Sequence, residues 1–200
     1  MKVIGLAGES GTGKSTIAAH LERKGATHID ADAVGHELLE GDAEVRCAIR
    51  DRIGSEVFDG DRVDRAALSR VVFGDEKALS ALNAIIHPAI VRVCERRISE
   101  LGKQGVGLVV IDAALLLEVS LPFQVDLMIA LRCSREEQLR RLQAKGGFSR
   151  QQIETRLANQ AAIQKSFCRA DVVVDSDRPK PVVLSEVERL IAFLLDEKSH

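Results

Sequence analysis

The 200-residue sequence predicts an α/β fold in which a doubly wound, parallel, five-stranded sheet carries an inserted helical segment. Three observations lead to this prediction. Short hydrophobic runs rich in Val, Ile and Leu recur along the chain, and helical patterns separate them. One interval of about 75 residues has helical periodicity but no convincing strand.

Five hydrophobic runs are the predicted strands. Apart from the second, which is the weakest, they are hydrophobic almost without alternation, as strands covered on both faces are. The runs are VIGLA (3–7), ATHID (26–30), GLVVID (107–112), VDLMIAL (125–131) and DVVVD (171–175).

Capping boxes predict where two helices begin, because each is a serine followed three residues later by Glu or Gln. Ser134 with Glu137 predicts a start near residue 135, and Ser149 with Gln152 predicts a start near residue 150. The double glycine at 146–147 fits the end of the first helix, where a left-handed residue is favoured.

The strand-free interval is predicted to be an inserted helical sub-domain at about residues 33–105. It would interrupt a single domain, 1–200, whose core lies at about 1–32 and 106–200. A crossover between parallel strands needs only a dozen or so residues, so the interval is longer than a connection requires. Inserted helices beside a nucleotide site often supply the pocket for a second substrate; the alternative is a purely stabilising role.

Composition excludes some classes of protein. A net charge of -2 argues against a general nucleic-acid or membrane-surface binder, and no apolar run is expected to reach the roughly 18 residues that span a bilayer. The four cysteines form no CxxC pair, which favours reduced thiols in a cytoplasmic protein. The oligomeric state stays open between a monomer and a small homo-oligomer.

A glycine-rich stretch, GESGTGKST, follows the first predicted strand and precedes an amphipathic helical pattern. It satisfies G-x-x-x-x-G-K-[ST], the phosphate-binding P-loop, whose glycines let backbone N–H groups turn toward phosphate oxygens. Lys14 would reach the β- and γ-phosphates, and the Ser15 hydroxyl would ligate Mg²⁺. The sequence therefore predicts a nucleoside triphosphate site.

The type of P-loop protein follows from what the chain lacks. It has neither an Asn-Lys-x-Asp element for reading guanine nor an Asp-x-x-Gly switch motif after the second strand. A small-molecule kinase is favoured. Two alternatives remain at this point: a kinase for another small acceptor such as a nucleoside, and an ATP-sensing binding module without turnover.

Three carboxylates lie where strands of the predicted sheet end, which is the edge at which such sheets bind ligands. Strand alternation would point Asp30 and Asp32 to the same side, and a helix N-cap is the alternative for Asp32. Asp112 resembles a strand-end acid that holds Mg²⁺ through water, with a turn or cap as its alternative.

A basic segment could cover the triphosphate. Residues 134–169 carry eight Lys or Arg against three Asp or Glu. Arg140 and Arg141 lie on the helix before the double glycine, and Lys145 lies in its last turn. Helix, double glycine and capped helix describe a lid at about residues 139–150, and guanidinium groups suit phosphate oxygens. Surface charge at a helix end is the alternative.

The ordered set of motifs resembles the dephospho-CoA kinases from Met1 to about Asp175. Only the P-loop is specific by itself. The other matching segments are Gly5–Gly8, Asp30–Asp32, Val63–Leu68 with Val72–Phe73, Ile86–Pro88, Leu115–Glu118, Gln138 with Arg141, Arg156 with Gln160, and Ala170–Asp171.

The resemblance implies ATP-dependent phosphorylation of the ribose 3′-hydroxyl of dephospho-CoA, the last step of CoA synthesis, with Mg²⁺. It also implies that the inserted helices are the CoA sub-domain. The catalytic residues that it implies are Asp32, Lys14 and Arg141, and Asp32 resembles a general base. The implied ATP-binding residues are Gly8, Gly11, Thr12, Gly13, Lys14, Ser15 and Thr16; the implied metal ligands are Ser15 and Asp112; the implied acceptor-binding residues are Asp32, Arg65, His87, Leu115 and Glu118.

The sequence also departs from the pattern of the dephospho-CoA kinases. Glu9 stands where glycine is common, and Ala114 and Leu117 replace a proline and a phenylalanine. Lys145 replaces a frequent lid arginine, and Asp175 stands where asparagine is usual near the adenine. His87, beside Pro88, is expected at a helix junction and is more often structural than catalytic.

Overall fold

The computed structural model describes residues 1–117, 119–147 and 149–196, with the backbone alone described at residues 73, 114, 115, 159, 161 and 162. The chain forms two compact units. Unit 1 comprises Met1–Asp30 and Ile98–His200, and unit 2 comprises Ala31–Arg97. Each unit is described by itself.

Unit 1 is built on a five-stranded sheet with strand order β2-β5-β1-β6-β7, in which every pair of neighbours is parallel. This confirms the predicted fold class. The strands are β1 (Lys2–Ala7), β2 (Thr27–Asp30), β5 (Leu108–Asp112), β6 (Leu127–Arg132) and β7 (Val172–Asp175). Leu6 of β1 and Asp30 of β2 are both paired with Asp112 of β5, so the carboxyl ends of three strands meet at one edge.

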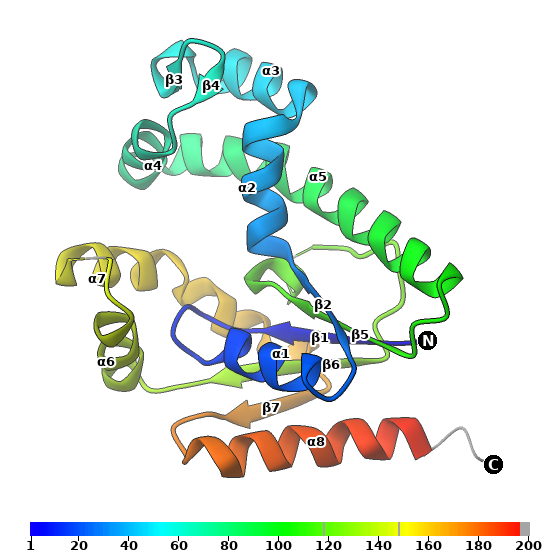
Figure 1. Ribbon diagram of the computed structural model, residues 1–200. Coiled ribbons are helices and arrows are strands. Elements are labelled where there is room, and N and C mark those ends of the chain that lie inside the picture. The colour runs from blue at the N-terminus through cyan, green and yellow to red at the C-terminus, as the bar shows by residue number, and fades with distance from the viewer. Residues whose placement is uncertain (118, 148, 197–200) are drawn as a thin grey trace. The chain divides into compact units, whose positions relative to one another are not determined.

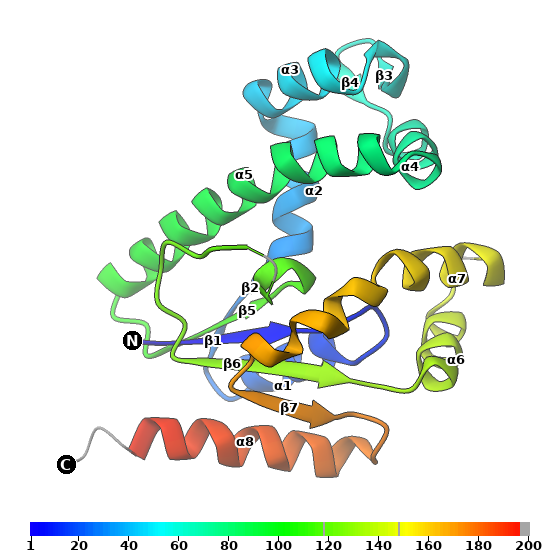
Figure 2. The ribbon, with the colours of Figure 1, turned by 180° about the vertical axis from the view of Figure 1, so that it is seen from behind.

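Helices cover the sheet of unit 1. Ile17 and Leu21 of α1 and Val183 and Val187 of α8 join strand side chains in the hydrophobic core, so these two helices lie on the same face (Figure 1). The 3-10 helix η3, which connects α7 to β7, contacts β6 and η2 (Figure 2). The bounds are α1 (Lys14–Glu22), α6 (Arg135–Lys145), α7 (Arg150–Asn159), α8 (Lys180–Asp196), and the 3-10 helices η2 (Ala114–Leu117) and η3 (Ala161–Arg169).

Both predicted helix starts are confirmed. At α7, Ser149 and Gln152 form the full capping box. At α6 the prediction is half wrong: the Ser134 hydroxyl accepts from the Glu137 N–H, but the Glu137 side chain turns to two arginines, and Asp177 accepts the Ser134 N–H instead. The Glu137 carboxylate thus pairs with charged guanidinium groups and not with the Ser134 N–H, because charge-assisted hydrogen bonds are stronger. Gly146 ends α6, as expected, but its φ of 74° and ψ of -178° are not those of a left-handed helical residue.

Unit 2 is mainly helical and also contains a small hairpin that the sequence analysis missed. Its strands have two residues each, too few to show any alternation, and Gly60 with φ 60° lies in the turn between them. The elements are α2 (Ala31–Gly41), α3 (Ala43–Arg52), η1 (Ser55–Val57), β3 (Phe58–Asp59), β4 (Arg62–Val63), α4 (Arg65–Gly74) and α5 (Glu76–Lys103), whose last turns belong to unit 1.

The long helix α5 corrects two expectations. It continues through Pro88, so the predicted junction at His87–Pro88 is wrong: a proline removes one backbone hydrogen bond, which a 28-residue helix with a buried face tolerates. Among the described residues, α5 alone is long and apolar enough to cross a membrane by length and composition. In the apolar window of this helix, 28% is buried, and Ala89, Ile90 and Cys94 are among the buried residues of the helix.

Candidate active site

The backbone of the P-loop, residues 8–13, turns sharply between β1 and α1. The Thr12 hydroxyl donates to the Glu9 carbonyl over 2.8 Å, which closes the turn. Gly8 approaches the Leu131 carbonyl so closely that a Cβ atom would lie 2.6 Å from it, and Gly13 has φ 98° at the N-cap of α1. The first N–H groups of α1 therefore open onto the loop, where a helix favours anions.

Lys14, Ser15 and Asp112 come together at the mouth of this loop. The Lys14 Nζ donates to the Gly8 carbonyl over 3.0 Å and lies 3.9 Å from Asp112 Oδ1. The Ser15 hydroxyl donates to Asp112 Oδ2 over 3.3 Å. Asp112 is buried at the end of β5. A cation, a hydroxyl and a carboxylate thus share one position at the carboxyl edge of the sheet.

Arg141 ties helix α6 to the P-loop and to the segment after β7. Its Nη1 donates to the Gly11 carbonyl over 3.3 Å, and its Nη2 donates to the Ser176 carbonyl over 2.6 Å. Its Nε donates to Glu137 over 2.7 Å. All three nitrogens are used, which holds the guanidinium plane beside Gly11 and Gly13.

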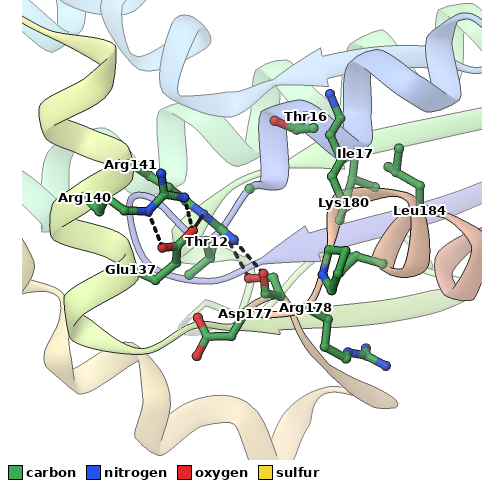
Figure 3. A pocket seen from close by; sticks show the side chains of 14 residues that line it. Thr12, Thr16, Ile17, Glu137, Arg140, Arg141, Asp177, Arg178, Lys180 and Leu184 are labelled. Atoms are coloured by element: carbon green, nitrogen blue, oxygen red, sulfur yellow. Dashed lines mark hydrogen bonds and ion pairs between the residues drawn. The ribbon is translucent and has the colours of Figure 1, made fainter.

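Glu137 lies between two arginines of the same helix (Figure 3). Its carboxylate pairs with Arg140 through two hydrogen bonds and with Arg141 through one. The hydrogen bond from Arg140, and then that from Arg141, lowers the pKa of Glu137 to about 2. Glu137 is therefore ionised at neutral pH and fixes both guanidinium groups near the loop.

Two further residues hold the outer side of the P-loop. Arg156 of α7 donates through Nε to the Ser10 hydroxyl over 2.8 Å, and Gln160 accepts the Ser10 N–H through Oε1 over 2.8 Å. In the sequence, Arg156 and Gln160 stand out only through the family resemblance. Their shared partner, Ser10, shows that they support the P-loop through both its backbone and a side chain.

A cavity of about 450 Å³ opens beside Thr12 and Gly13 (Figure 3). Its described lining holds no aromatic side chain, in agreement with the scarcity of aromatic residues in the sequence. Ile17, Val183 and Leu184 supply apolar parts of the lining, and Arg140, Arg141, Arg178 and Lys180 supply cationic groups. The lining residues are Thr12, Gly13, Thr16, Ile17, Glu137, Arg140, Arg141, Ser176–Lys180, Val183 and Leu184.

The segment after β7 forms one wall of this cavity and is fixed by Asp177. That carboxylate accepts the Cys133 thiol over 3.0 Å and the Ser134 N–H over 3.0 Å. Burial, and then the hydrogen bond to Asp177, raises the pKa of the Cys133 thiol to about 12, so the thiol is protonated and unreactive. Asp175 accepts the Asp177 N–H over 3.0 Å and so shapes the same turn.

Unit 2 contains a second cavity, of about 570 Å³. Arg65, the first residue of α4, donates to His36 Nε2 over 2.8 Å at its edge, and Asp64 caps the helix. Most of the wall is apolar. The lining residues are His36, Leu39, Arg65, Ala66, Leu68, Ser69, Val72 and Leu82.

The remaining acceptor-side predictions have different outcomes. Asp32 is the exposed second residue of α2, because β2 ends at Asp30 and the helix begins at once; strand alternation therefore does not apply to it, and it is not the N-cap. His87 is half-buried on α5 and does not line the cavity of unit 2; burial lowers its pKa, so the ring is neutral at pH 7. The Leu115 side chain and the whole of Glu118 lie outside the described residues.

Comparison with known proteins decides which family this site belongs to. The sequence profile of dephospho-CoA kinase matches residues 2–180. A dephospho-CoA kinase of Geobacter sulfurreducens is 37% identical over 194 residues, which are 96% of this chain and 98% of that protein. The chain belongs to the dephospho-CoA kinase family.

Solved structures agree with this membership. TT1252 from Thermus thermophilus is 30% identical and superposes with a TM-score of 0.75 over 100% of this chain and 98% of that chain. A dephospho-CoA kinase from Campylobacter jejuni shares the fold, with a TM-score of 0.63 at 21% identity over 96% of each chain. The chain is thus an ATP-dependent kinase by family, with a small-molecule substrate.

Within this kinase, the structure brings the nucleotide-side predictions together in unit 1. The P-loop residues Gly8, Gly11, Thr12, Gly13, Lys14, Ser15 and Thr16 form one continuous turn and helix start, beside Asp112 and Arg141. Sequence reasoning missed Glu137 and Ser176 as partners of Arg141. Ser176 carried one usable signal, because it is the first residue after the fifth predicted strand, at the edge that binds ligands.

Proposed function

We propose that Lys14, Asp32 and Arg141 carry out the reaction of the family, the transfer of the γ-phosphoryl group of ATP to the ribose 3′-hydroxyl of dephospho-CoA. One observation supports this proposal most strongly. Lys14, Ser15 and Asp112 already lie together at the P-loop, and Arg141 bridges that loop to the cavity wall. Phosphoryl transfer depends mainly on positioning and charge stabilisation, which this arrangement supplies.

The nucleotide would lie with its phosphates in the P-loop, residues Gly8 to Thr16, and its base and ribose in the cavity of 450 Å³ beside Thr12. Arg140, Arg178 and Lys180 on the cavity wall would compensate the charge of the phosphates. Arg141 would bind γ-phosphate oxygens as negative charge moves toward the bridging oxygen. We propose that residues 139–150 act as the lid over this site.

Mg²⁺ would be held by Ser15 and Asp112. A hydroxyl oxygen and a carboxylate oxygen 3.3 Å apart are the hard oxygen donors that this ion prefers, and Mg²⁺ usually keeps several waters besides one or two protein ligands. The donor set therefore fits. When bound, the ion neutralises charge on the phosphate oxygens. Ser15 and Asp112 orient it, and the Lys14 ammonium supplies a second positive charge.

The acceptor would be bound by unit 2, which makes residues 33–105 the CoA sub-domain. Arg65 offers a cation beside a mostly apolar cavity, a combination that suits a phosphorylated ligand with an extended organic arm. Asp32 is exposed in the first turn of α2 and would accept the proton of the 3′-hydroxyl. The O–P bond to ADP breaks as the new O–P bond to the ribose oxygen forms, so CoA and ADP are the products.

The test is to incubate the purified chain with ATP, Mg²⁺ and dephospho-CoA and to measure product masses. The expected result is a gain of one phosphate by dephospho-CoA, with stoichiometric ADP. Nucleosides serve as competing acceptors in parallel reactions. Phosphorylation of a nucleoside alone would assign a different acceptor, and nucleotide binding without ADP release would indicate an ATP sensor; either outcome contradicts the proposal.

The location that we propose for the chain is the cytoplasm. Its four cysteines, Cys47, Cys94, Cys133 and Cys168, are free thiols, two of them buried. Free thiols are typical of a reducing compartment. CoA synthesis from ATP also needs a compartment that contains both ATP and the acceptor.

A further inference from the structure

Glu9 places a buried carboxylate inside the P-loop. Its residue surface is only 3% exposed, and its side chain is not part of the G-x-x-x-x-G-K-[ST] motif. Carboxylate Oε2 accepts the Gln138 amide over 3.0 Å and the Gln164 amide over 2.7 Å. A buried carboxylate is costly unless it is hydrogen-bonded in this way, so the two amides compensate for its burial.

The two amide donors come from two elements that are distant in the sequence. Gln138 is on α6, is 1% exposed, and lies 129 residues from Glu9; Gln164 is on η3. Both amides donate through their nitrogens to the same carboxylate oxygen. One side chain of the P-loop thus joins the two segments that flank α7.

The link through Gln138 leads directly to Arg141. These residues are three positions apart on α6, which places them on one face of the helix. Loop and helix are also in close contact: a Cβ atom on Gly11 would lie 3.1 Å from the Gln138 carbonyl. A shift of α6 therefore moves the arginine relative to the loop whose Gly11 carbonyl it contacts.

We infer that Glu9 is a positioning residue for nucleotide binding: it anchors α6 to the P-loop and thereby sets the place of Arg141. The inference rests on the proposed role of the P-loop and Arg141 in ATP binding. It does not depend on the acceptor, so it is tested by nucleotide binding rather than by turnover. Glu9 itself would act through Gln138 and Arg141.

The first experiment measures Mg·ATP affinity by calorimetry for wild type, Glu9→Ala and Glu9→Gln. Glu9→Ala removes both hydrogen bonds, and we expect the Kd to rise about tenfold. Glu9→Gln keeps an amide oxygen that accepts both amides, and we expect a Kd within about threefold of wild type. Glu136→Ala is the matched control, because it removes an exposed acid from α6, the helix that Glu9 anchors; its Kd should stay within about twofold.

The second experiment separates positioning from general destabilisation. In an Arg141→Ala background, Glu9→Ala should change the Kd by less than about twofold, because the residue through which it acts is gone. Multiplicative effects of the two substitutions would overturn the inference. So would a wild-type Kd in Glu9→Ala, or a lowered melting temperature with an unchanged Kd.

A further variant covers the case in which Glu9→Ala does not fold. Gln138→Met removes the amide donor and keeps the volume of a buried side chain, and we expect the same rise in Kd, about tenfold. A wild-type Kd in Gln138→Met would contradict the inference. If the wild-type chain binds Mg·ATP but does not phosphorylate dephospho-CoA, the acceptor assignment fails while these affinities still decide the role of Glu9.

Discussion

The two units of the chain hold their candidate functional side chains in different ways. In unit 1, Lys14, Ser15 and Arg141 are fixed by hydrogen bonds to the P-loop, Asp112 and Ser176. In unit 2, Asp32 is exposed on the first turn of α2, and the exposed Arg65 side chain donates to His36 Nε2. The nucleotide side is therefore preorganised by its own backbone, whereas the acceptor side presents groups to solvent.

This difference has a consequence for catalysis. Preorganised donors stabilise developing charge without reorganising during the reaction, so substitutions among them should reduce both nucleotide binding and turnover. Exposed groups on a helical unit take part only when an acceptor is bound. Substitutions in unit 2 should therefore change acceptor kinetics and leave the affinity for Mg·ATP unchanged.

The largest expected effect is that of Lys14→Ala. The ammonium group is the positive charge closest to the P-loop carbonyls, and its loss should reduce kcat at least about 10³-fold. Mg·ATP affinity, measured by calorimetry, should also fall. Lys24→Ala is the control, because Lys24 is an exposed lysine paired with Glu188 after α1. Turnover above a tenth of the wild-type rate in Lys14→Ala would remove this lysine from the mechanism.

Asp32→Asn should have the next largest effect and should distinguish the role of unit 2 in turnover from the role of unit 1 in ATP binding. The asparagine keeps the shape but cannot take a proton, so we expect kcat to fall about 10²- to 10⁴-fold. The Kd for Mg·ATP should stay at its wild-type value. Glu44→Gln, an exposed acid near the start of α3, is the matched control. A large loss of ATP affinity in Asp32→Asn would show that Asp32 contributes to nucleotide binding. The proposed contrast between a nucleotide-binding unit 1 and an acceptor-binding unit 2 would then be wrong.

The same contrast explains how far the sequence could predict the site. The P-loop was predictable because its function depends on local backbone geometry, and positive-φ glycines such as Gly11 and Gly13 mark that geometry directly. Asp112 was predictable as a strand-end acid, since parallel strands end at one edge. Glu137 was not predictable, because the same position suits a capping box with Ser134 and ion pairs with Arg140 and Arg141, and the sequence does not decide between them.

In unit 2 the sequence signals were weaker for physical reasons. The two-residue strands β3 and β4 are too short to show a period, and Pro88 lies inside a helix that its buried face keeps continuous. The change from β2 to α2 occurs within one residue, between Asp30 and Ala31, so a period-2 argument failed for Asp32. Side chains that act only on a bound acceptor lie at exposed positions, and the hydrophobic periodicity of the sequence does not distinguish them from other exposed polar residues.

Arg65→Ala should give a smaller effect, restricted to the acceptor. Losing a single exposed cation at the cavity edge should raise the KM for dephospho-CoA about tenfold, with kcat and ATP affinity nearly unchanged. Steady-state kinetics with dephospho-CoA varied at saturating ATP measure this split. Arg52→Ala, on an exposed arginine of α3, is the control. An unchanged KM in Arg65→Ala would show that the cavity of unit 2 does not hold the charged part of the acceptor.

The smallest expected effect concerns the stability of unit 1 and depends on pH. The pKa of Glu137 is held at about 2 by Arg140 and Arg141, below that of an ordinary glutamate. Its ion pairs therefore stabilise the fold at neutral pH, and this contribution is lost as the pH falls from the unfolded-state pKa through the folded-state value near 2. Since Arg140 is largely exposed, solvent screening keeps this contribution to stability small.

Urea unfolding of wild type and Glu137→Gln at several pH values measures this contribution. The stability gap should be largest above about pH 5, should narrow through pH 3, and should shrink in 1 M salt. Glu136→Gln, the exposed neighbour, should show no such pH-dependent gap. A gap that stays constant down to pH 2.5 would mean that Glu137 stabilises unit 1 by packing and not by charge. The preorganisation of Arg141 would then come from the P-loop and Ser176 alone.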